Sequence, residues 1–181
     1  DYTLIDSELY SNGSTADANL RVAYKFMGAT PDTTVTFGPT GSTNDDGVIA
    51  VYVFSGVDQT TPLDVAATTA TGTGEQPNPP SITPVTAGAY IMAVGSAGDQ
   101  LVNSFTSSDL TSFVSVEHSD TVNYATLGIG LKTDWTSGAF NPAAYTASGG
   151  TAGGAWAAVT IALRPTSERS EERRVGKECL R

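Results

Sequence analysis

Ala157-Ala-Val-Thr-Ile-Ala-Leu163 decides the fold, because its large apolar residues stand at every second position. Side chains of a β-strand point alternately to its two faces, so Val159, Ile161 and Leu163 share one face. A helix would instead need an apolar residue every three or four positions, and the chain has few of the residues that favour such a stripe. The stretch is therefore predicted to be a strand with one face in a core.

Four more stretches have the pattern of strands. Residues 20–26 and 127–132 alternate large apolar residues with small or charged ones, which predicts half-buried strands. Val48–Phe54 and Ala89–Val94 are apolar on both faces, which predicts central strands covered on each side. Turn-forming pairs such as Asn12-Gly13 separate the stretches. Together they predict an all-β fold, an antiparallel β-sandwich of the jelly-roll type.

The two halves of the chain resemble each other. Leu20–Lys25 aligns with Leu127–Lys132 at a shift of 107 residues, and Gly47–Tyr52 aligns with Ala155–Thr160 at a shift of 108. Sandwiches can arise from two such halves, although short β patterns also align by chance. Ala89–Val94 has no counterpart in the first half. The repeat therefore predicts one further strand ahead of residue 1, and a sheet edge left unpaired in this chain.

A single sandwich domain is predicted for residues 1–165, with its halves at 1–65 and 81–165. Residues 66–80 lack large apolar side chains, so they are predicted to be an exposed connection that begins as an edge strand. Residues 166–181 are predicted to be a non-native, disordered tail outside this domain.

Most of that tail, Arg169-Ser-Glu-Glu-Arg-Arg-Val-Gly-Lys-Glu-Cys179, resembles the in-frame translation of a common sequencing adapter, so we exclude it from the fold. Residues 169–181 carry five of the nine Lys and Arg residues and the single cysteine. The remaining body has four basic and sixteen acidic residues, a net charge of −12. Such a charge repels phosphate backbones and anionic lipids, which argues against nucleic-acid and membrane partners. A body without thiols has no disulfide or thiolate metal site, and no cofactor is predicted.

Gly56-Val-Asp-Gln-Thr-Thr-Pro-Leu-Asp64 follows the apolar stretch at 48–54. Its Gly-Val-Asp-x-x-x-Pro-x-Asp pattern resembles a motif in a family of β-sandwich domains from phage structural proteins and bacterial surface proteins. Shorter matches keep the order of that family at residues 2–5, 23–25, 84–94 and 159–165. The resemblance implies a sandwich fold, a place in a virion or at a cell surface, and other virion or surface proteins as partners.

Two departures from the family pattern are present: Ser55 stands where the family has arginine, and the opening strand of the family has no counterpart. The motif itself is interpreted as a structural turn. Gly56 permits a tight exit from a strand, and Asp58 can fold its carboxylate onto nearby backbone N–H groups. Pro62 stiffens the return and Asp64 braces the loop. A ligand site is the alternative.

Few residues are suited to catalysis. His118, the single histidine, is interpreted as a solvated loop residue, because no serine elbow accompanies it. Asn44-Asp-Asp-Gly47 offers oxygen atoms to Ca²⁺ but lacks the spacing of a dedicated loop, so a hairpin turn is favoured and no metal site is predicted. Ser148–Gly154 lacks the lysine of a phosphate cradle and is interpreted as a flexible loop. No pair of catalytic carboxylates stands out, because such pairs are spatial rather than sequential.

Trp135, Phe140 and Tyr145 form an aromatic cluster in the sequence, beside Asp134. Aromatic faces with polar neighbours can stack on sugars, and loops on a rigid sandwich often carry binding sites. The alternative is that these rings close the open end of the core. The sequence leaves both interpretations open.

The function predicted from these observations is that of a non-catalytic structural or adhesive module of a virion or a bacterial cell surface. The rival prediction is a carbohydrate-binding module that delivers a polysaccharide-active enzyme, with glycans as partners. An independent hydrolase comes third. The sequence does not determine the oligomeric state.

Overall fold

A computed structural model of the chain describes residues 2–12, 17–30, 32–35, 47–98, 102–119, 124–149 and 154–166. Every helix or strand in these ranges is a β-strand, and the strand pairs are antiparallel. The predicted all-β fold is therefore confirmed. Residues 44–46 of the candidate calcium turn, Gly13 of the first turn and the tail at 169–179 lie outside the described residues.

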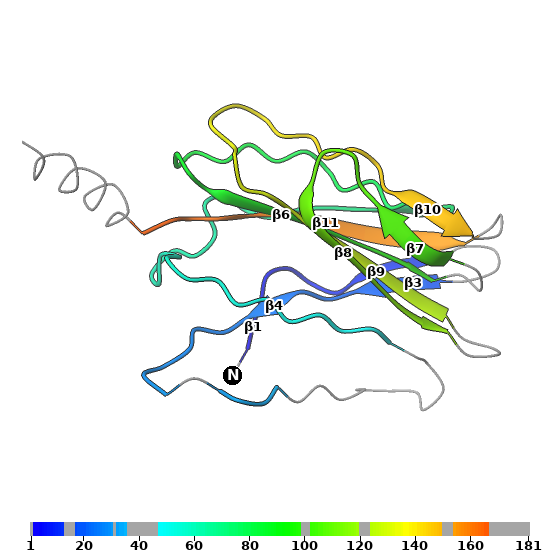
Figure 1. Ribbon diagram of the computed structural model, residues 1–181, viewed down its shortest axis with the longest axis horizontal. Coiled ribbons are helices and arrows are strands. Elements are labelled where there is room, and N and C mark those ends of the chain that lie inside the picture. The colour runs from blue at the N-terminus through cyan, green and yellow to red at the C-terminus, as the bar shows by residue number, and fades with distance from the viewer. Residues whose placement is uncertain are drawn as a thin grey trace, which may run out of the picture.

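The described strands fall into one large sheet and three short pairs (Figure 1). Their bounds are β1 Thr3–Leu4, β2 Leu9–Asn12, β3 Asp17–Leu20, β4 Ala23–Tyr24, β5 Thr68–Thr73, β6 Tyr90–Gly98, β7 Val102–Thr106, β8 Thr111–Ser119, β9 Tyr124–Lys132, β10 Thr146–Gly149 and β11 Ala155–Leu163.

The large sheet has five strands in the order β5-β11-β6-β9-β8. In β6, every residue from Ile91 to Ala97 is buried, so both faces of the strand are covered. This confirms the central strand predicted from Ala89–Val94. The strands predicted from 127–132 and 157–163 also form, as β9 and β11. β5 lies at the sheet edge, which confirms the edge strand predicted at the start of 66–80.

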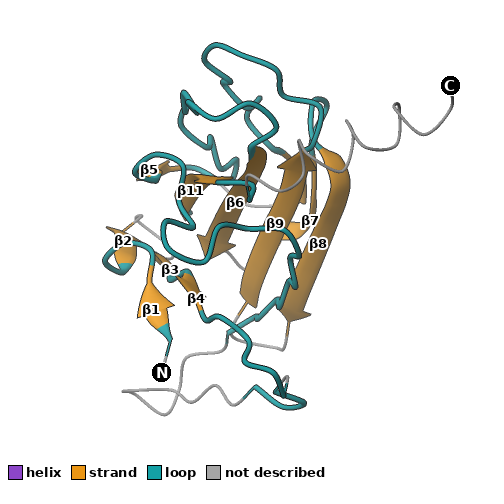
Figure 2. Ribbon diagram, turned by 90° about the vertical axis from the view of Figure 1, so that its left-hand side faces the viewer, coloured by secondary structure: helices purple, strands orange, loops and turns teal. Residues whose placement is uncertain are grey.

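Each face of this sheet carries its own covering layer (Figures 1 and 2). On one face, a core cluster packs against partly buried side chains from residues 5–22 and 48–54; its members are Leu20, Met92, Val94, Leu127, Ile129, Ala157, Val159 and Ile161. The opposite face packs against Phe105, Leu110 and Tyr145, which belong to the β7–β10 pair and its neighbouring loops. The sandwich therefore has a third, partial layer that the sequence did not predict.

Glycines on β9 make room for that third layer. A Cβ atom on Gly128 would lie 3.0 Å from the rings of Phe105 and Tyr145, and one on Gly130 would lie 2.7 Å from Leu110 Cβ. The separation at Gly130 is shorter than real Cβ atoms show, and those at Gly128 are shorter than most, so neighbouring side chains fill the space that a β9 side chain would take. The alternation of large residues with glycine in 127–132 thus follows from two differently covered faces.

The first half of the chain repeats the pairing register of the second half. In the first half, β2 pairs with β3 as Leu9↔Leu20 through to Asn12↔Asp17. Adding 107 to both members of each of these four pairs gives the pairs of β8 with β9, from Val116↔Leu127 through to Ser119↔Tyr124. A chance likeness of short sequence patterns does not require the pairing register to agree as well. The shared register supports two related halves.

Val48–Phe54 does not form the central strand that its sequence predicts. The segment makes no strand ladder with any described residue, and Figure 1 draws it as a plain cyan tube. Its burial alternates: the residues at 48, 50, 52 and 54 are partly buried on the core, whereas Ile49, Val51 and Val53 are 52%, 57% and 70% exposed. The physical reason is that no described strand lies alongside it to pair with its backbone.

This alternation also corrects the repeat alignment of that segment. At a shift of 108, the exposed Ile49 aligns with Ala157, whose side chain lies in the core cluster. Because successive strand residues face opposite sides, this alignment matches the outward face of one segment with the core face of the other. An odd shift, as found for β3 and β9, keeps the core-facing residues matched.

Three smaller predictions need correction. The connection at 66–80 is not exposed throughout, because Pro77 and Pro79 are fully buried. His118 lies in strand β8, opposite Ala125, rather than in a loop. Ser148 and Gly149 belong to β10, and the rest of that predicted loop lies mostly outside the described ranges.

Candidate functional site

The segment Gly56–Asp64 forms a corner that joins the first half of the chain to the five-stranded sheet. It runs antiparallel to the end of β11, with bridges Val57↔Pro165 and Leu63↔Leu163. The backbone N–H of Asp58 donates to Arg164 O at 2.9 Å, and the N–H of Asp64 donates to Ala162 O at 2.8 Å. Because β5 follows along the same edge, the chain from Gly56 to Thr73 lines one side of β11. We call Gly56–Asp64 the corner segment.

Two residues shape the turn inside the corner segment as the sequence predicts. Gly56 has a φ of 73°, a left-handed conformation that favours glycine. The Oδ1 atom of Asp58 accepts hydrogen bonds from the backbone N–H groups of Thr60 and Thr61, both at 2.8 Å. This is the Asx turn expected of an aspartate before a tight return. The carbonyl of Pro62 then accepts from the N–H of Arg164 at 2.8 Å.

Asp64 is the buried end of the corner segment, with a side chain that is 0% exposed. Its Oδ2 atom accepts hydrogen bonds from the backbone N–H groups of Val85 at 2.6 Å and Thr86 at 2.9 Å. Its Oδ1 atom accepts from Arg164 Nε at 3.2 Å, and Arg164 Nη2 also donates to the Asp64 carbonyl at 3.1 Å. One carboxylate therefore holds together the corner, the chain ahead of β6 and the end of β11. This arrangement is called the Asp64 clamp below.

Arg164 is the ion-pair partner of Asp64, and the sequence did not predict this pairing. It stands 100 residues from Asp64, and no local pattern relates the two positions. The available signal was that Arg164 is one of only four basic residues in the body and directly follows the last strand. In a chain with so few cations, a cation next to a buried strand is a candidate partner for a buried carboxylate.

The electrostatics of the clamp favour the charged form of Asp64. Burial by itself would raise the pKa of this carboxyl group. Hydrogen bonds from the side chain and backbone of Thr86 and from the backbone of Val85, together with the charge of Arg164, outweigh burial and bring the pKa below its usual value. The carboxylate is thus charged at neutral pH and fully engaged in hydrogen bonds.

The free energy of unfolding should fall as the pH drops from about 5 to about 3. A lowered folded-state pKa means that ionised Asp64 stabilises the protein above the unfolded-state pKa of about 3.9, and that this contribution is lost as the pH falls through the folded-state value. Urea unfolding across this pH interval measures the effect. The Asp64→Asn variant should lose less stability over the interval than the parent chain, and an equal loss would assign the acid sensitivity elsewhere, for example to Asp58 or Asp134, whose pKa values are also lowered.

The aromatic residues predicted as a sugar site lie mainly inside the protein. Tyr145 is 0% exposed, and its hydroxyl donates to Ala93 O of β6 at 2.9 Å. Its ring packs edge-on against Phe113, with ring centroids 5.0 Å apart. Burial raises the pKa of this phenol, so the hydroxyl stays protonated and remains a donor. Tyr145 thus pins the third layer to the central sheet, and a sugar ring has no access to it.

Trp135 is 8% exposed, and its Nε1–H donates to Gly138 O within the same loop at 3.0 Å. Phe140 is half-buried and exchanges two backbone hydrogen bonds with Ile82, both at 2.9 Å. Asp134 is exposed and forms an ion pair with Lys132 at 2.8 Å. The four residues therefore do not converge on one open surface. Their burial supports the interpretation in which the rings close the core.

Replacing Trp135 by alanine should lower the free energy of unfolding by about 3 kcal/mol, the lower end of the range for core tryptophans, because a nearly buried indole would leave a void. Thermal unfolding and a glycan-binding panel, run on the same two proteins, separate the two interpretations. A variant that melted like the parent but lost glycan binding would contradict the packing role.

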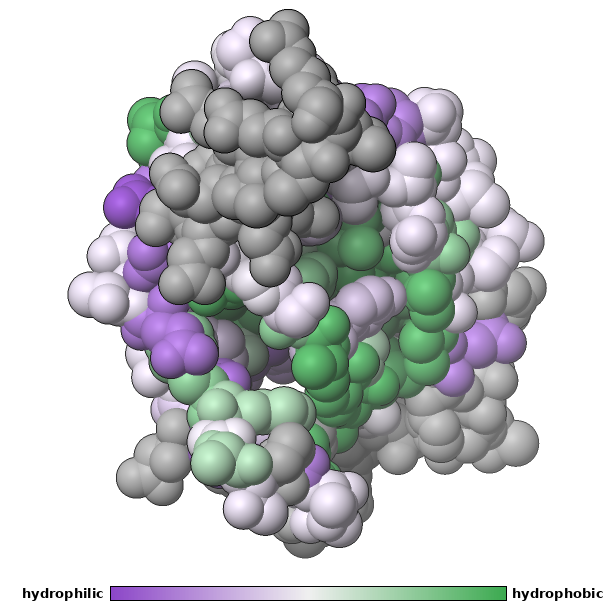
Figure 3. Space-filling model, turned by 60° about the vertical axis from the view of Figure 1, so that its left-hand side comes forward, coloured by the Kyte–Doolittle hydropathy of each residue, from purple (hydrophilic) through white to green (hydrophobic). Residues whose placement is uncertain are grey.

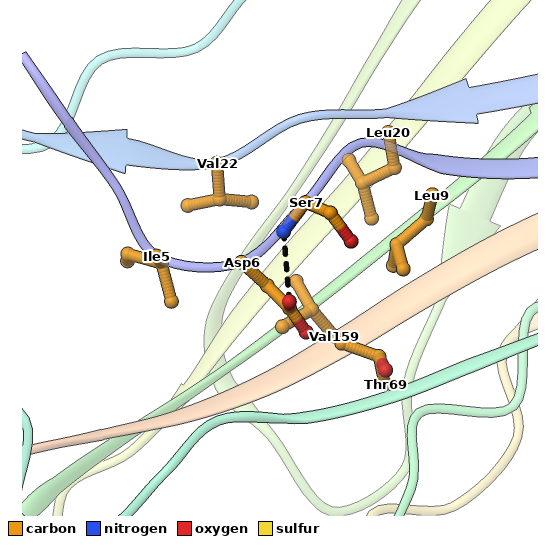
Figure 4. A pocket seen from close by; sticks show the side chains of 8 residues that line it. All are labelled: Ile5, Asp6, Ser7, Leu9, Leu20, Val22, Thr69 and Val159. Atoms are coloured by element: carbon orange, nitrogen blue, oxygen red, sulfur yellow. Dashed lines mark hydrogen bonds between the residues drawn. The ribbon is translucent and has the colours of Figure 1, made fainter.

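A small hollow lies between the first-half layer and the large sheet (Figure 4). It has room for about one water molecule, so it does not hold a ligand of useful size. Most of its lining is apolar, and its one charged side chain, Asp6, accepts a hydrogen bond from the Ser7 backbone N–H at 2.7 Å. The lining residues are Ile5, Asp6, Ser7, Leu9, Leu20, Val22, Thr69 and Val159.

Among the residues that the structure describes, no three His, Cys, Asp or Glu side chains come together as a metal site. No helix of the length and apolarity that a membrane span requires occurs in the described ranges. Comparisons with protein-family models, curated proteins and solved structures give no match for this chain.

Proposed function

We propose that this chain is a non-catalytic structural or adhesive module of a virion or a bacterial cell surface. The observation that carries the proposal is the Asp64 clamp. The buried Asp64 carboxylate is the most distinctive polar group in the described chain. It accepts hydrogen bonds from two backbone N–H groups and from Arg164. A catalytic or ligand-binding acid would instead keep part of its hydrogen-bonding capacity for a substrate.

Other polar side chains serve the same purpose. Asp58 holds the turn of the corner segment, and Asp109 accepts hydrogen bonds from Ser107 Oγ at 3.0 Å and from the Ala143 backbone N–H at 2.9 Å. Polar groups used in this way make loops rigid. Rigid loops on a sandwich suit a module that must keep its shape within an assembly.

A negatively charged body supports the choice of partners. With the adapter-like tail set aside, its net charge of −12 favours solubility and disfavours contact with nucleic acid and anionic lipid. Other virion or surface proteins are the proposed partners, and the exposed apolar residues Ile49, Val51 and Val53 offer part of a contact surface.

Two measurements test the proposal. The purified domain should leave a panel of plant, algal and bacterial polysaccharides uncleaved, and product formation from any of them would overturn the non-catalytic assignment. The full-length gene should lie among tail, portal or capsid genes, or carry surface-attachment domains. A glycosidase domain in the same reading frame, together with retention of the domain on a polysaccharide column, would favour the carbohydrate-binding rival.

A further inference from the structure

Two backbone edges in the first-half layer have no strand partner among the described residues, although the Asn19 carbonyl of β3 accepts a side-chain hydrogen bond from Ser96 Oγ at 3.2 Å. β3 and β4 pair with β2 and β1 on one side only. Residues 47–54 are extended and alternate in burial like a strand, yet they form no ladder. An extended edge with free N–H and C=O groups is a template for another strand. Figure 3 shows green, apolar surface gathered around a hollow on this side of the molecule.

The second half of the chain shows what belongs between two such edges. There, β9 pairs with β8 on one side and with β6 on the other, and β6 pairs in turn with β11. The β2–β3 ladder has the register of the β8–β9 ladder at a shift of 107. Residues 47–54 follow β4 in the chain as β11 follows β9. The counterpart of β6 is therefore the one member of the four-strand unit that has no corresponding segment among the described residues of the first half.

We propose that a further β-strand of the β6 type pairs antiparallel with β3–β4 on one side and with residues 47–54 on the other. Because β6 precedes β8 and β9 in the chain, the repeat assigns its counterpart to the same polypeptide, ahead of β1. The occupant is thus a segment of the full-length protein that precedes residue 1. Its insertion turns the first-half layer into a continuous sheet and gives residues 47–54 the ladder that their sequence predicts.

The register of β6 specifies the pattern of the new strand. Val94 of β6 stands opposite Ile129 of β9 and Val159 of β11, and all three side chains lie in the core. Subtracting 107 from Ile129 gives Val22, so the residue of the new strand opposite Val22 faces the core and is apolar. The residue two positions earlier is apolar as well, as Met92 is in β6, whereas the position two residues later takes a small polar residue, as Ser96 does.

Grafting a copy of β6 onto the chain tests the proposal. In the second half, residues 89–107 contain β6, β7 and part of the connection to β8, so a copy of them joined ahead of Asp1 keeps the 107-residue spacing of the repeat. Hydrogen exchange of the backbone amides at 18–24 and 48–54 should slow by about tenfold or more in the grafted chain. Its Tm should rise by about 5 °C. Unchanged exchange at both segments, with an unchanged Tm, would overturn the proposal.

A matched control separates strand insertion from a general effect of the added residues. The control carries the same graft with Met92→Asp and Val94→Asp in the copied strand only, which places charges on the core-facing side. It should show the exchange rates of the unmodified chain, and protection equal to that of the intact graft would contradict insertion. Light scattering on the unmodified chain provides the second check. If that chain forms a dimer whose 48–54 amides are already protected, a second copy of the chain occupies the edge, and the assignment to the same polypeptide fails.

Discussion

Asp64→Ala should lower the free energy of unfolding by about 3–5 kcal/mol, because removal of a fully buried, hydrogen-bonded carboxylate leaves the groups that donate to it unsatisfied. The orphaned groups would be the N–H groups of Val85 and Thr86 and the guanidinium of Arg164. The loss should exceed that of an ordinary surface substitution several-fold. Urea unfolding at neutral pH, with the slope compared between proteins, measures the change.

Asp58→Ala is the matched control for this prediction. Asp58 lies in the same corner segment and accepts two backbone hydrogen bonds, but its carboxylate is solvated. Water can replace its contacts, so this variant should be clearly less destabilised than Asp64→Ala. Equal losses in the two variants would show that the turn, rather than the buried clamp, holds the corner to β11.

Tyr145→Ala should also lower the free energy of unfolding by about 3–5 kcal/mol, the usual cost of deleting a buried aromatic side chain. The ring fills the space above Gly128 and lies against Phe105 and Phe113. Its removal leaves a cavity that glycine on β9 cannot fill. Because the third layer is short, amides of β7 and β10 should lose protection from hydrogen exchange before those of β6.

Tyr145→Phe keeps the ring and removes only the hydroxyl group that donates to Ala93 O. Its cost should be about 1 kcal/mol, that of one hydrogen bond. A Phe variant as unstable as the Ala variant would assign the stability to the hydrogen bond instead of to packing. Calorimetric melting of the three proteins distinguishes these outcomes.

Three strands of the large sheet, β6, β9 and β11, were predictable because local pattern and tertiary environment agree, whereas β8 was not predicted. β9 and β11 alternate with a period of two, and β6 is apolar on both sides because both of its faces are covered. The corner segment was predictable for the same reason: a positive φ at Gly56 and the Asx turn at Asp58 are local requirements with local sequence signals.

The features that could not be predicted from the sequence depend on residues that are far apart in the chain. Val48–Phe54 has the composition of a buried strand, but a ladder needs a second strand, and composition does not show whether that strand is present. Trp135 and Tyr145 are residue types that serve equally in sugar sites and in cores, so only their burial separates the two roles. The pairing of Asp64 with Arg164 spans 100 residues, beyond any local pattern.

The position of β11 has a consequence for the order of folding. β11 is the last described strand to be synthesised, yet it lies between β5 and β6, and the corner segment lines the same edge as β5. Before β11 is synthesised, the strands β5 and β6 therefore have no common neighbour, and Asp64 has no Arg164 to pair with. The five-stranded sheet can therefore be completed only after almost the whole domain has left the ribosome. Slow folding through non-local contacts is expected of all-β topologies. During that interval, the exposed edges of β5 and β6 are the places where the nascent chain would misassemble.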